Sequence, residues 1–292
     1  MKGIDPSTSP VVGNSEKLGL GELLERVRLL ATDLDGTLLG DGGLILPETK
    51  QAWRLWSELG GSLVVITGRP FTSLLQVLTG QDSGEKWPFP DAVVCEERDA
   101  YLHEGAGSWQ PLDESGAALA RERALLEISS SVAEKLIARG VAKGYEVKRS
   151  TESAEWERGY VELRFPNKLE AERARLWVTP VLGGRPLVPV RNGRLMSLRH
   201  KDFRKGPALQ RLTAHLGLAP NQILAVGDSH NDLSMLDGTY GFLSATVANA
   251  DEEILRAVGS ANGILTPHRS SLGVAWLLEA LVACQSEQGV TK

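Results

Sequence analysis

Short apolar runs alternate with amphipathic stretches in the first part of the chain. Such runs are typical of strands that are buried on both faces of a parallel sheet, and they begin at Leu29, Ser62 and Asp91. Between the first two runs, apolar residues from Ala52 to Leu59 recur at helical spacing, and Gly60 and Gly61 then end the pattern. A second helix is predicted from Phe71 to Leu78. This alternation predicts strand–helix units and a parallel sheet.

The pattern changes in the middle of the chain, after about Glu97. The sequence there predicts the order helix, strand, strand, twice over, at Ser115–Arg139, Tyr145–Ser150, Tyr160–Phe165, Lys168–Val178, Leu187–Val190 and Leu195–Leu198. The dipeptide Asn192-Gly193 between the last two strands is a strong signal for a tight hairpin. This order indicates a small antiparallel sheet that is covered by helices on one face.

Alternation of helices and strands returns at Lys205, where a helix begins with Pro207 in its first turn. The elements that follow are predicted at Ile223–Val226, Gly241–Val247, Asp251–Val258, Gly263–Thr266 and from Leu272 onward. We therefore predict an α/β protein, in which a doubly wound parallel-sheet core carries an inserted α+β cap. Residues 1–27 are predicted to be a flexible leader, residues 28–97 and 199–292 the core, and residues 98–198 the cap.

Composition narrows the possible functions of the 292-residue chain. A net charge of −5 and a pI near 5.7 argue against a protein that binds nucleic acid or an anionic membrane. The sequence has no apolar stretch long enough to span a bilayer and no apolar core of the signal-peptide type. Cys95 and Cys284 are expected to be reduced thiols in a cytoplasmic protein, which we expect to be a monomer or a homodimer.

Two carboxylates follow the first predicted strand, in the sequence Thr32-Asp33-Leu34-Asp35-Gly36. Side chains two positions apart on a strand point the same way, so Asp33 and Asp35 share one pocket if the extended geometry continues that far. Two like charges held so close repel each other unless a cation or a shared proton lies between them. The alternative is an Asp/Gly turn in which both carboxylates cap backbone amides.

Other polar residues occupy matching places in the core. Thr67 and Gly68 follow the second strand, Lys205 begins a helix, and Asp228 follows a later strand. Asn231 and Asp232 come directly after it. Because ligands bind at the carboxyl ends of the strands in open α/β sheets, these residues are candidates for one site. Thr67, Asn231 and Asp232 could instead cap the helices that follow them, and Lys205 could be a solvated lysine.

In combination, these motifs resemble those of the haloacid dehalogenase superfamily of phosphohydrolases, namely Asp-X-Asp-Gly-Thr, a strand-terminal Thr, a Lys and Gly-Asp-X-X-Asn-Asp. The insert resembles the type-II-B cap of Cof-like sugar phosphatases, sucrose-phosphate phosphatases and phosphomannomutases. The resemblance implies that Asp33 is the nucleophile and Asp35 the general acid and base. It implies Mg²⁺ held by Asp33, the main-chain carbonyl of Asp35, Asp228 and Asp232. The donors to the substrate phosphate are then Thr67, Gly68, Lys205 and Asn231.

The predicted function is therefore a Mg²⁺-dependent phosphatase that hydrolyses a small phosphate ester, a sugar phosphate above all, through an aspartyl-phosphate. Two alternatives remain at this point. One is a phosphomutase, which needs a cluster of cationic side chains in the cap to retain a bisphosphate intermediate. The other is a catalytically silent protein that binds a phosphorylated ligand, which has no evident need for both Asp33 and Asp35.

Several residues near these motifs have weaker functional signals. Arg69 could face the phosphate, the cap or solvent, and His230 is interpreted as a bystander. The tryptophans Trp53 and Trp56 are predicted to pack against the sheet, whereas solvent is the expected environment for Tyr101, Arg149, Arg158 and Arg164. Residues 95–101 (Cys-Glu-Glu-Arg-Asp-Ala-Tyr) depart from the Ser-Glu-Asn-Gly-Ala pattern usual in Cof-like members where the third strand enters the cap. A stiffer and more charged hinge is therefore predicted.

Overall fold

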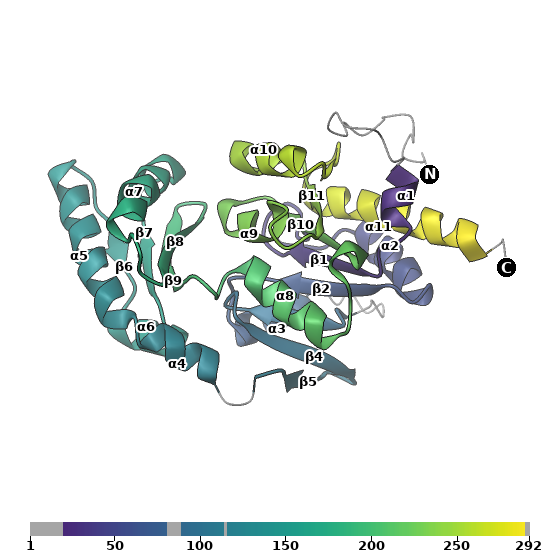
Figure 1. Ribbon diagram of the computed structural model, residues 1–292, viewed down its shortest axis with the longest axis horizontal. Helices are drawn as coiled ribbons and strands as arrows, with labels where there is room; N and C mark the ends of the chain where they lie inside the picture. The colour runs from purple at the N-terminus through teal and green to yellow at the C-terminus, as the bar shows by residue number, and fades with distance from the viewer. Residues whose placement is uncertain (1–19, 81–88, 114–115, 290–292) are drawn as a thin grey trace.

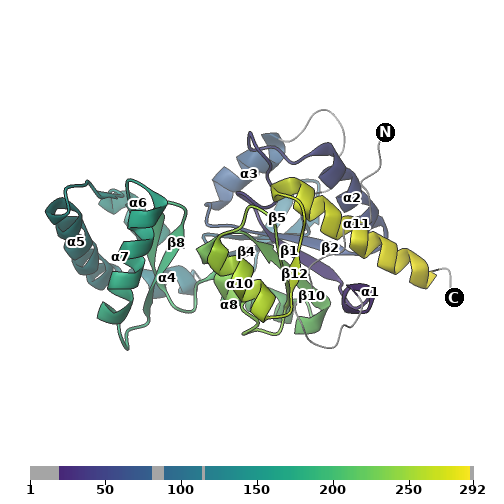
Figure 2. The same ribbon diagram turned by 90° about the horizontal axis from the view of Figure 1, so that it is seen from above.

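The computed structural model describes residues 20–80, 89–113 and 116–289, which form a core and a cap (Figures 1 and 2). Of the predicted leader, residues 1–19 lie outside the described residues. Its last part belongs to the core, because Leu20–Leu24 form helix α1 and both Leu24 and Val27 are fully buried. The prediction that the leader extends to residue 27 is wrong, since these two side chains add apolar surface to the core. None of the described helices has the length and apolar character that crossing a membrane requires.

The core contains an eight-stranded sheet in the order β12-β11-β10-β1-β2-β3-β4-β5. Its strands are β1 (Leu29–Asp33), β2 (Ser62–Ile66), β3 (Ala92–Cys95), β4 (Asp99–Gly105), β5 (Ser108–Pro111), β10 (Ile223–Gly227), β11 (Leu243–Thr246) and β12 (Ile264–Leu265). The six strands from β12 to β3 are parallel, which confirms the predicted parallel sheet. Side chains alternate between its two faces, so that Leu30 belongs to one apolar cluster and Leu29 and Ala31 to the other.

Helices cover both faces of the core sheet (Figures 1 and 2). One face packs against α1, α2 (Pro47–Glu58), α3 (Phe71–Gly80) and α11 (Ser270–Gly289). The other packs against α8 (Lys205–His215), α9 (Leu233–Leu236) and α10 (Glu252–Ser260). This arrangement confirms the predicted doubly wound architecture. Trp53 and Trp56 of α2 are fully buried in the first cluster, as predicted.

The chain does not enter the cap directly after β3, contrary to the prediction. Residues 95–98 form a tight turn, in which the N–H of Arg98 donates to the carbonyl of Cys95 at 3.0 Å. Strands β4 and β5 then pair antiparallel along the edge of the core sheet. The core therefore continues to Pro111. A hairpin can follow β3 because an antiparallel strand needs only a short turn, whereas a parallel strand needs a long crossover.

The cap extends from α4 to β9 and has its own four-stranded antiparallel sheet in the order β6-β7-β9-β8. Its elements are α4 (Ala117–Arg123), α5 (Leu126–Ala142), β6 (Lys148–Arg149), α6 (Glu152–Arg158), β7 (Val161–Arg164), α7 (Lys168–Val181), β8 (Leu187–Asn192) and β9 (Leu195–His200). Helices α5 and α7 lie on the side of this sheet that faces away from the core (Figures 1 and 2). The predicted hairpin is confirmed, with Gly193 at φ +54°. The short helix α6, between β6 and β7, is not predicted.

A glycine after α2 allows Trp56 to pack close to the backbone. A methyl group at position 61 would overlap the indole ring of Trp56, whose Nε1 donates to the carbonyl of Ser62 at 3.1 Å. We expect Gly61→Ala to lower the free energy of unfolding by about 1–3 kcal/mol, because the buried ring must shift to avoid the overlap. Denaturant unfolding tests this, with Gly259→Ala as the control, since a methyl group on that helical glycine meets open space. Equal stability of the two variants would contradict the expectation.

Candidate active site

The site begins where two neighbouring parallel strands end. Strand β1 ends at Asp33 and β10 ends at Gly227, directly before Asp228; the two strands are paired in register. Gly36 lets the chain turn away between them, at φ +84°. A Cβ at position 36 would lie 2.8 Å from Oδ2 of Asp228. Only glycine fits this turn without strain, so the Asp-X-Asp-Gly motif brings Asp228 close to the backbone of the β1 turn.

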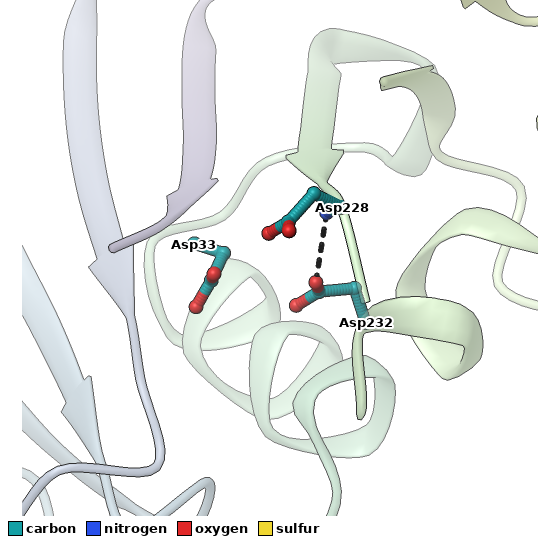
Figure 3. A group of neighbouring side chains, drawn as sticks. All are labelled: Asp33, Asp228 and Asp232. Carbon is teal, nitrogen blue, oxygen red and sulfur yellow. Dashed lines mark hydrogen bonds between the residues drawn. The ribbon is translucent and has the colours of Figure 1, made fainter. Parts of the chain in front are cut away.

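Three carboxylates converge at this edge of the sheet, from Asp33, Asp228 and Asp232 (Figure 3). One oxygen of each lies within 4.8 Å of the others. Their positions are fixed by hydrogen bonds, because Oδ2 of Asp232 accepts the backbone N–H groups of Asp228 and Ser229, both at 2.9 Å. The Thr37 hydroxyl donates to Oδ1 of Asp228 at 2.8 Å. Asp232 thus combines a capping role with a place in the cluster, and its predicted role as a metal ligand stays a prediction.

Lys205 holds the carboxylate cluster together from the start of α8. Its side chain is fully buried, and Nζ donates to Asp33 and, at 2.5 Å, to Oδ1 of Asp232. Burial disfavours the ammonium, but the charges of Asp232 and Asp33 outweigh burial and raise the pKa of Lys205 above its ordinary value. Lys205 is therefore not a solvated lysine. It is a charged partner of the cluster.

The cluster has the chemistry of a divalent cation site. Burial raises the pKa of Asp33 well above its ordinary value, opposed by Lys205 and reinforced by Asp232 and Asp228. Burial and the charge of Asp232 likewise raise the pKa of Asp228 to about 7. Three ionised carboxylates and one ammonium leave two negative charges, which one divalent cation neutralises. Carboxylate oxygens are the ligands that hard divalent cations prefer.

Asp35 lies at the edge of this site and not within the carboxylate cluster. Strand β1 ends at Asp33, so the extended geometry that would align the two side chains does not continue to Asp35. The Asp35 carboxylate accepts two hydrogen bonds from Arg69, at 2.6 and 2.7 Å. Both side chains are partly exposed, at 42% for Asp35 and 35% for Arg69. The predicted metal ligand, the main-chain carbonyl of Asp35, stays a prediction.

Three of the four predicted phosphate donors, Thr67, Gly68 and Asn231, line the same hollow as Asp35. Thr67 follows β2 and is buried, and its Oγ1 accepts the N–H of Arg69 at 3.1 Å. Buried Asn231 donates Nδ2 to Oε1 of Glu97 at 3.1 Å. A Cβ at Gly68 would lie 3.6 Å from the same oxygen of Glu97. Glu97 is a further residue of this site, which the sequence marks only as part of a charged hinge.

A cavity of about 370 Å³ opens between the core and the cap at this point. The predicted residues Asp35, Thr67, Gly68 and Asn231 line it, together with Arg69 and Glu97; from the cap come Arg158, Tyr160, Glu162, Asn192, Ser197 and Arg199. Another hollow, of about 470 Å³, lies at the amino ends of β10 and β11 and contains none of the predicted residues. The cavity at the carboxyl edge is therefore the candidate substrate site.

Cap arginines near this cavity are not solvated, contrary to the prediction for Arg158. The Arg158 side chain is 25% exposed and bonds Glu162 at 3.1 Å. Arg199 is almost fully buried and binds both oxygens of Glu122, at 2.7 and 3.1 Å. Its guanidinium lies 3.9 Å from the ring centre of Tyr160. No local motif marks Arg199 and Glu122, because they are far apart in sequence and meet only in the folded chain.

The other residues that the sequence suggested lie away from the cavity. Tyr101 stacks on Phe71 beside the core sheet, and Arg149 pairs with Glu134 and Glu155 inside the cap. His230 accepts the N–H of Arg191 at 3.2 Å. Burial and neighbouring arginines lower the pKa of His230 to about 3, so it is neutral. Arg164 is exposed on β7, as predicted.

A second contact between cap and core lies at the start of α10. Arg191 of β8 is buried and donates to Asp251 at 2.7 Å and to Glu253 at 2.9 Å. The N–H of Asp251 donates to the carbonyl of Asp228 at 2.8 Å. The cap is thus held against the core at Asp251, a residue that is hydrogen-bonded to the main chain of Asp228.

Comparisons with known proteins identify relatives of both domains. The haloacid dehalogenase-like hydrolase family matches residues 30–87 and 190–278, on either side of most of the cap. A glucosylglycerol-phosphate synthase of Pseudomonas anguilliseptica is 28% identical over 87% of this chain, which spans only 30% of that protein. A phosphoglycolate phosphatase of Methanoculleus marisnigri is 30% identical over 34% of this chain and 40% of its own length. The chain thus spans less than half the length of these relatives.

Solved structures show the same fold over most of the chain. The sucrose-phosphatase from Synechocystis, determined with sucrose and phosphate, has a TM-score of 0.60 at 21% identity and covers 87% of this chain and 97% of its own. A haloacid dehalogenase-like hydrolase from B. subtilis has a TM-score of 0.58 at 20% identity, with 87% and 99% covered. At these identities the likeness concerns the fold, including the inserted cap.

Proposed function

This chain belongs to the haloacid dehalogenase-like hydrolases, and we propose that it is a Mg²⁺-dependent phosphatase acting on a small sugar phosphate. The observation that supports this most directly is the convergence of Asp33, Asp228, Asp232 and Lys205 at one sheet edge, beside the cavity between core and cap. A carboxylate nucleophile and a phosphate ester are both anions, and two unit charges about 4 Å apart repel by roughly 4 kcal/mol at an effective dielectric of about 20. A cation at the cluster, held by the three carboxylates and the Asp35 carbonyl, offsets that repulsion.

In the proposed reaction, an oxygen of Asp33 forms a bond to phosphorus as the ester P–O bond breaks. This gives an aspartyl-phosphate, a form of covalent catalysis known for carboxylates. Asp35 donates a proton to the leaving oxygen and then takes one from the water that attacks phosphorus. The Asp33–phosphorus bond breaks in this second step and inorganic phosphate leaves. Since both Asp35 oxygens now accept hydrogen bonds from Arg69, the acid role requires Arg69 to release one of them.

Lys205, Thr67, Gly68 and Asn231 supply donors around the phosphoryl oxygens in this proposal. Charge spreads over these oxygens in the transition state, so prearranged donors lower the barrier. Lys205 also keeps Asp33 in place, because the same ammonium bonds Asp33 and Asp232.

Release of inorganic phosphate from a panel of esters, with Mg²⁺ and with EDTA, tests the proposal. The names of the relatives suggest glucosylglycerol phosphate, sucrose phosphate and phosphoglycolate, and hexose phosphates are included as general sugar phosphates. We expect Mg²⁺-dependent release from at least one sugar phosphate. No release from any ester, combined with measurable ligand binding, would instead favour a silent phospholigand-binding protein.

The cavity argues against a phosphomutase. A mutase must retain a bisphosphate through several available cationic side chains. Among the described residues that line the cavity, the arginines Arg69, Arg158 and Arg199 each already pair with a carboxylate. Isomer formation from hexose monophosphates, without phosphate release, would overturn this argument.

Proton and metal binding should compete at the carboxylate cluster. The pKa of Asp228 is about 7 in the folded protein and close to 3.8 in the unfolded chain. Protonation of Asp228 therefore stabilises the folded protein. This stabilisation is fully present below about pH 4 and is lost as pH rises through about 7. We therefore expect Mg²⁺ at about 100 times its Kd to raise Tm by about 5–10 °C near pH 8.

Near pH 5.5 the increase in Tm should be much smaller, because protons then occupy the carboxylates. Differential scanning calorimetry with Mg²⁺ or EDTA measures both values. Asp228→Asn should lose the increase and the exposed control Asp41→Asn should keep it. An increase in Tm that is equal at the two pH values would contradict a site built from these carboxylates.

A further inference from the structure

Glu97 is a buried carboxylate at the edge of the candidate phosphate site, and the proposed reaction does not use it. It lies in the turn between β3 and β4, and its side chain is 5% exposed. Both Glu96 and Glu97 have positive φ, at 51° and 53°, which is unusual for residues other than glycine and asparagine. This backbone conformation is held by the N–H of Glu97, which donates to the carbonyl of Thr67 at 3.0 Å. The turn therefore fixes Glu97 against the end of β2.

The two oxygens of Glu97 have different surroundings. Oε1 accepts from Asn231 at 3.1 Å, beside Gly68. Within the part of the chain that the structure describes, Oε2 is buried and accepts no hydrogen bond. The closest cationic atom paired with it is Nη1 of Arg199 at 4.0 Å, beyond hydrogen-bond distance. A buried carboxylate oxygen without a donor is costly. Glu97 lines the cavity, and a rotation of its side chain that turns Oε2 to the cavity surface lets a substrate hydroxyl donate to it.

The cationic side chains that line the cavity are already neutralised. Arg69 binds both oxygens of Asp35, and Arg199 binds both oxygens of Glu122. Arg158 pairs with Glu162 and Glu96. Among the described residues that line the cavity, a second anionic group on the substrate would therefore meet only arginines that already pair with a carboxylate. It would also lie close to the incompletely paired charge of Glu97.

We propose that Glu97 determines substrate specificity by accepting a hydrogen bond from a hydroxyl near the ester and excluding substrates with a second anionic group. The preferred leaving group is then an uncharged polyol or sugar, and carboxylate-bearing esters are poor substrates. This inference rests on the proposed phosphatase function, whose substrate class it narrows. A site that is built to hydrogen-bond a substrate hydroxyl rejects analogues without it far more strongly than an apolar pocket can.

A matched pair of esters tests the inference. Glycerol 3-phosphate and 3-phosphoglycerate differ only by a carboxylate in place of a terminal hydroxymethyl group. We expect wild-type kcat/KM to favour glycerol 3-phosphate by at least about 10-fold. Glu97→Gln keeps the size of the side chain and removes its charge. It should lower this ratio by roughly 10-fold, through a higher KM for the alcohol and a lower KM for the acid.

Glu104→Gln, an exposed change on β4, is the control and should leave the ratio unchanged. Circular dichroism shows whether each variant is folded. If Glu97→Gln does not fold, the kcat/KM ratio of the wild type for the two esters tests the inference alone. A wild-type preference for 3-phosphoglycerate, or a ratio that Glu97→Gln does not alter, would overturn it. Acetyl phosphate distinguishes a failure of the phosphatase proposal from a failure of the proposed role of Glu97. If neither this acyl phosphate nor any phosphate ester is hydrolysed, the phosphatase function itself fails, whereas hydrolysis without selectivity refutes only the role of Glu97.

Discussion

The Asp33→Asn variant is expected to lose at least about 10⁴-fold in phosphate release and to keep its fold, as is typical when a catalytic nucleophile is removed. The amide has the size of the carboxylate but is a far weaker nucleophile toward phosphorus. Asp33 lies in a buried cluster, where Asp232 and Asp228 repel its charge. Replacing it by a neutral group removes this repulsion and leaves Lys205 bonded to Asp232. The metal-free variant should therefore be at least as stable as the wild type.

Steady-state phosphate release and thermal unfolding in EDTA together measure these effects. Asp41→Asn, at an exposed position, should change neither quantity. Retained activity of Asp33→Asn would refute the nucleophile assignment. A large loss of stability would show instead that Asp33 has a mainly structural role.

The Lys205→Met variant is expected to lose both activity and stability, in contrast to Asp33→Asn. The ammonium is fully buried and is bonded to Asp33 and Asp232. Methionine leaves these carboxylates and Asp228 without their cationic partner, and breaking a buried ion pair in this way costs about 3–5 kcal/mol. Loss of a prearranged donor to the transition state should lower kcat by a further 10²–10³-fold or so.

The destabilisation of Lys205→Met should depend on pH and on the metal. It should be largest near pH 8 in EDTA and smaller near pH 5, because protonation relieves the repulsion between the carboxylates. Mg²⁺ should restore more stability to this variant than to the wild type. The control is Lys201→Met, four residues earlier and exposed. Urea unfolding under these conditions measures each effect, and a loss of stability independent of pH would contradict the electrostatic explanation.

The fold could be predicted from the sequence where a segment is buried on both sides. Short apolar runs in the sequence predict strands β1, β2, β3 and β10. Gly60 and Gly193 predict turns, because glycine adopts positive φ without strain. The prediction was wrong where pairing depends on distant partners. The residues of β4 and β5 have no strong period of their own, and they become strands because the edge of the core sheet is available to them. The boundary of the cap was therefore placed too early.

The sequence by itself determined which residues are candidates for catalysis, namely Asp33, Asp35, Thr67, Lys205 and Asp228. Each of these lies at or just after the end of a strand or at the start of a helix, and the geometry of parallel sheets brings such ends to one edge. Only the tertiary structure decided how the charges are shared. In the folded chain, Asp35 pairs with Arg69, the cap arginine Arg158 pairs with Glu162, and Oε2 of Glu97 accepts no hydrogen bond from the described residues. The strength of an electrostatic interaction depends on the distance between the charges and on how far water is excluded from them. Local sequence patterns specify neither of these.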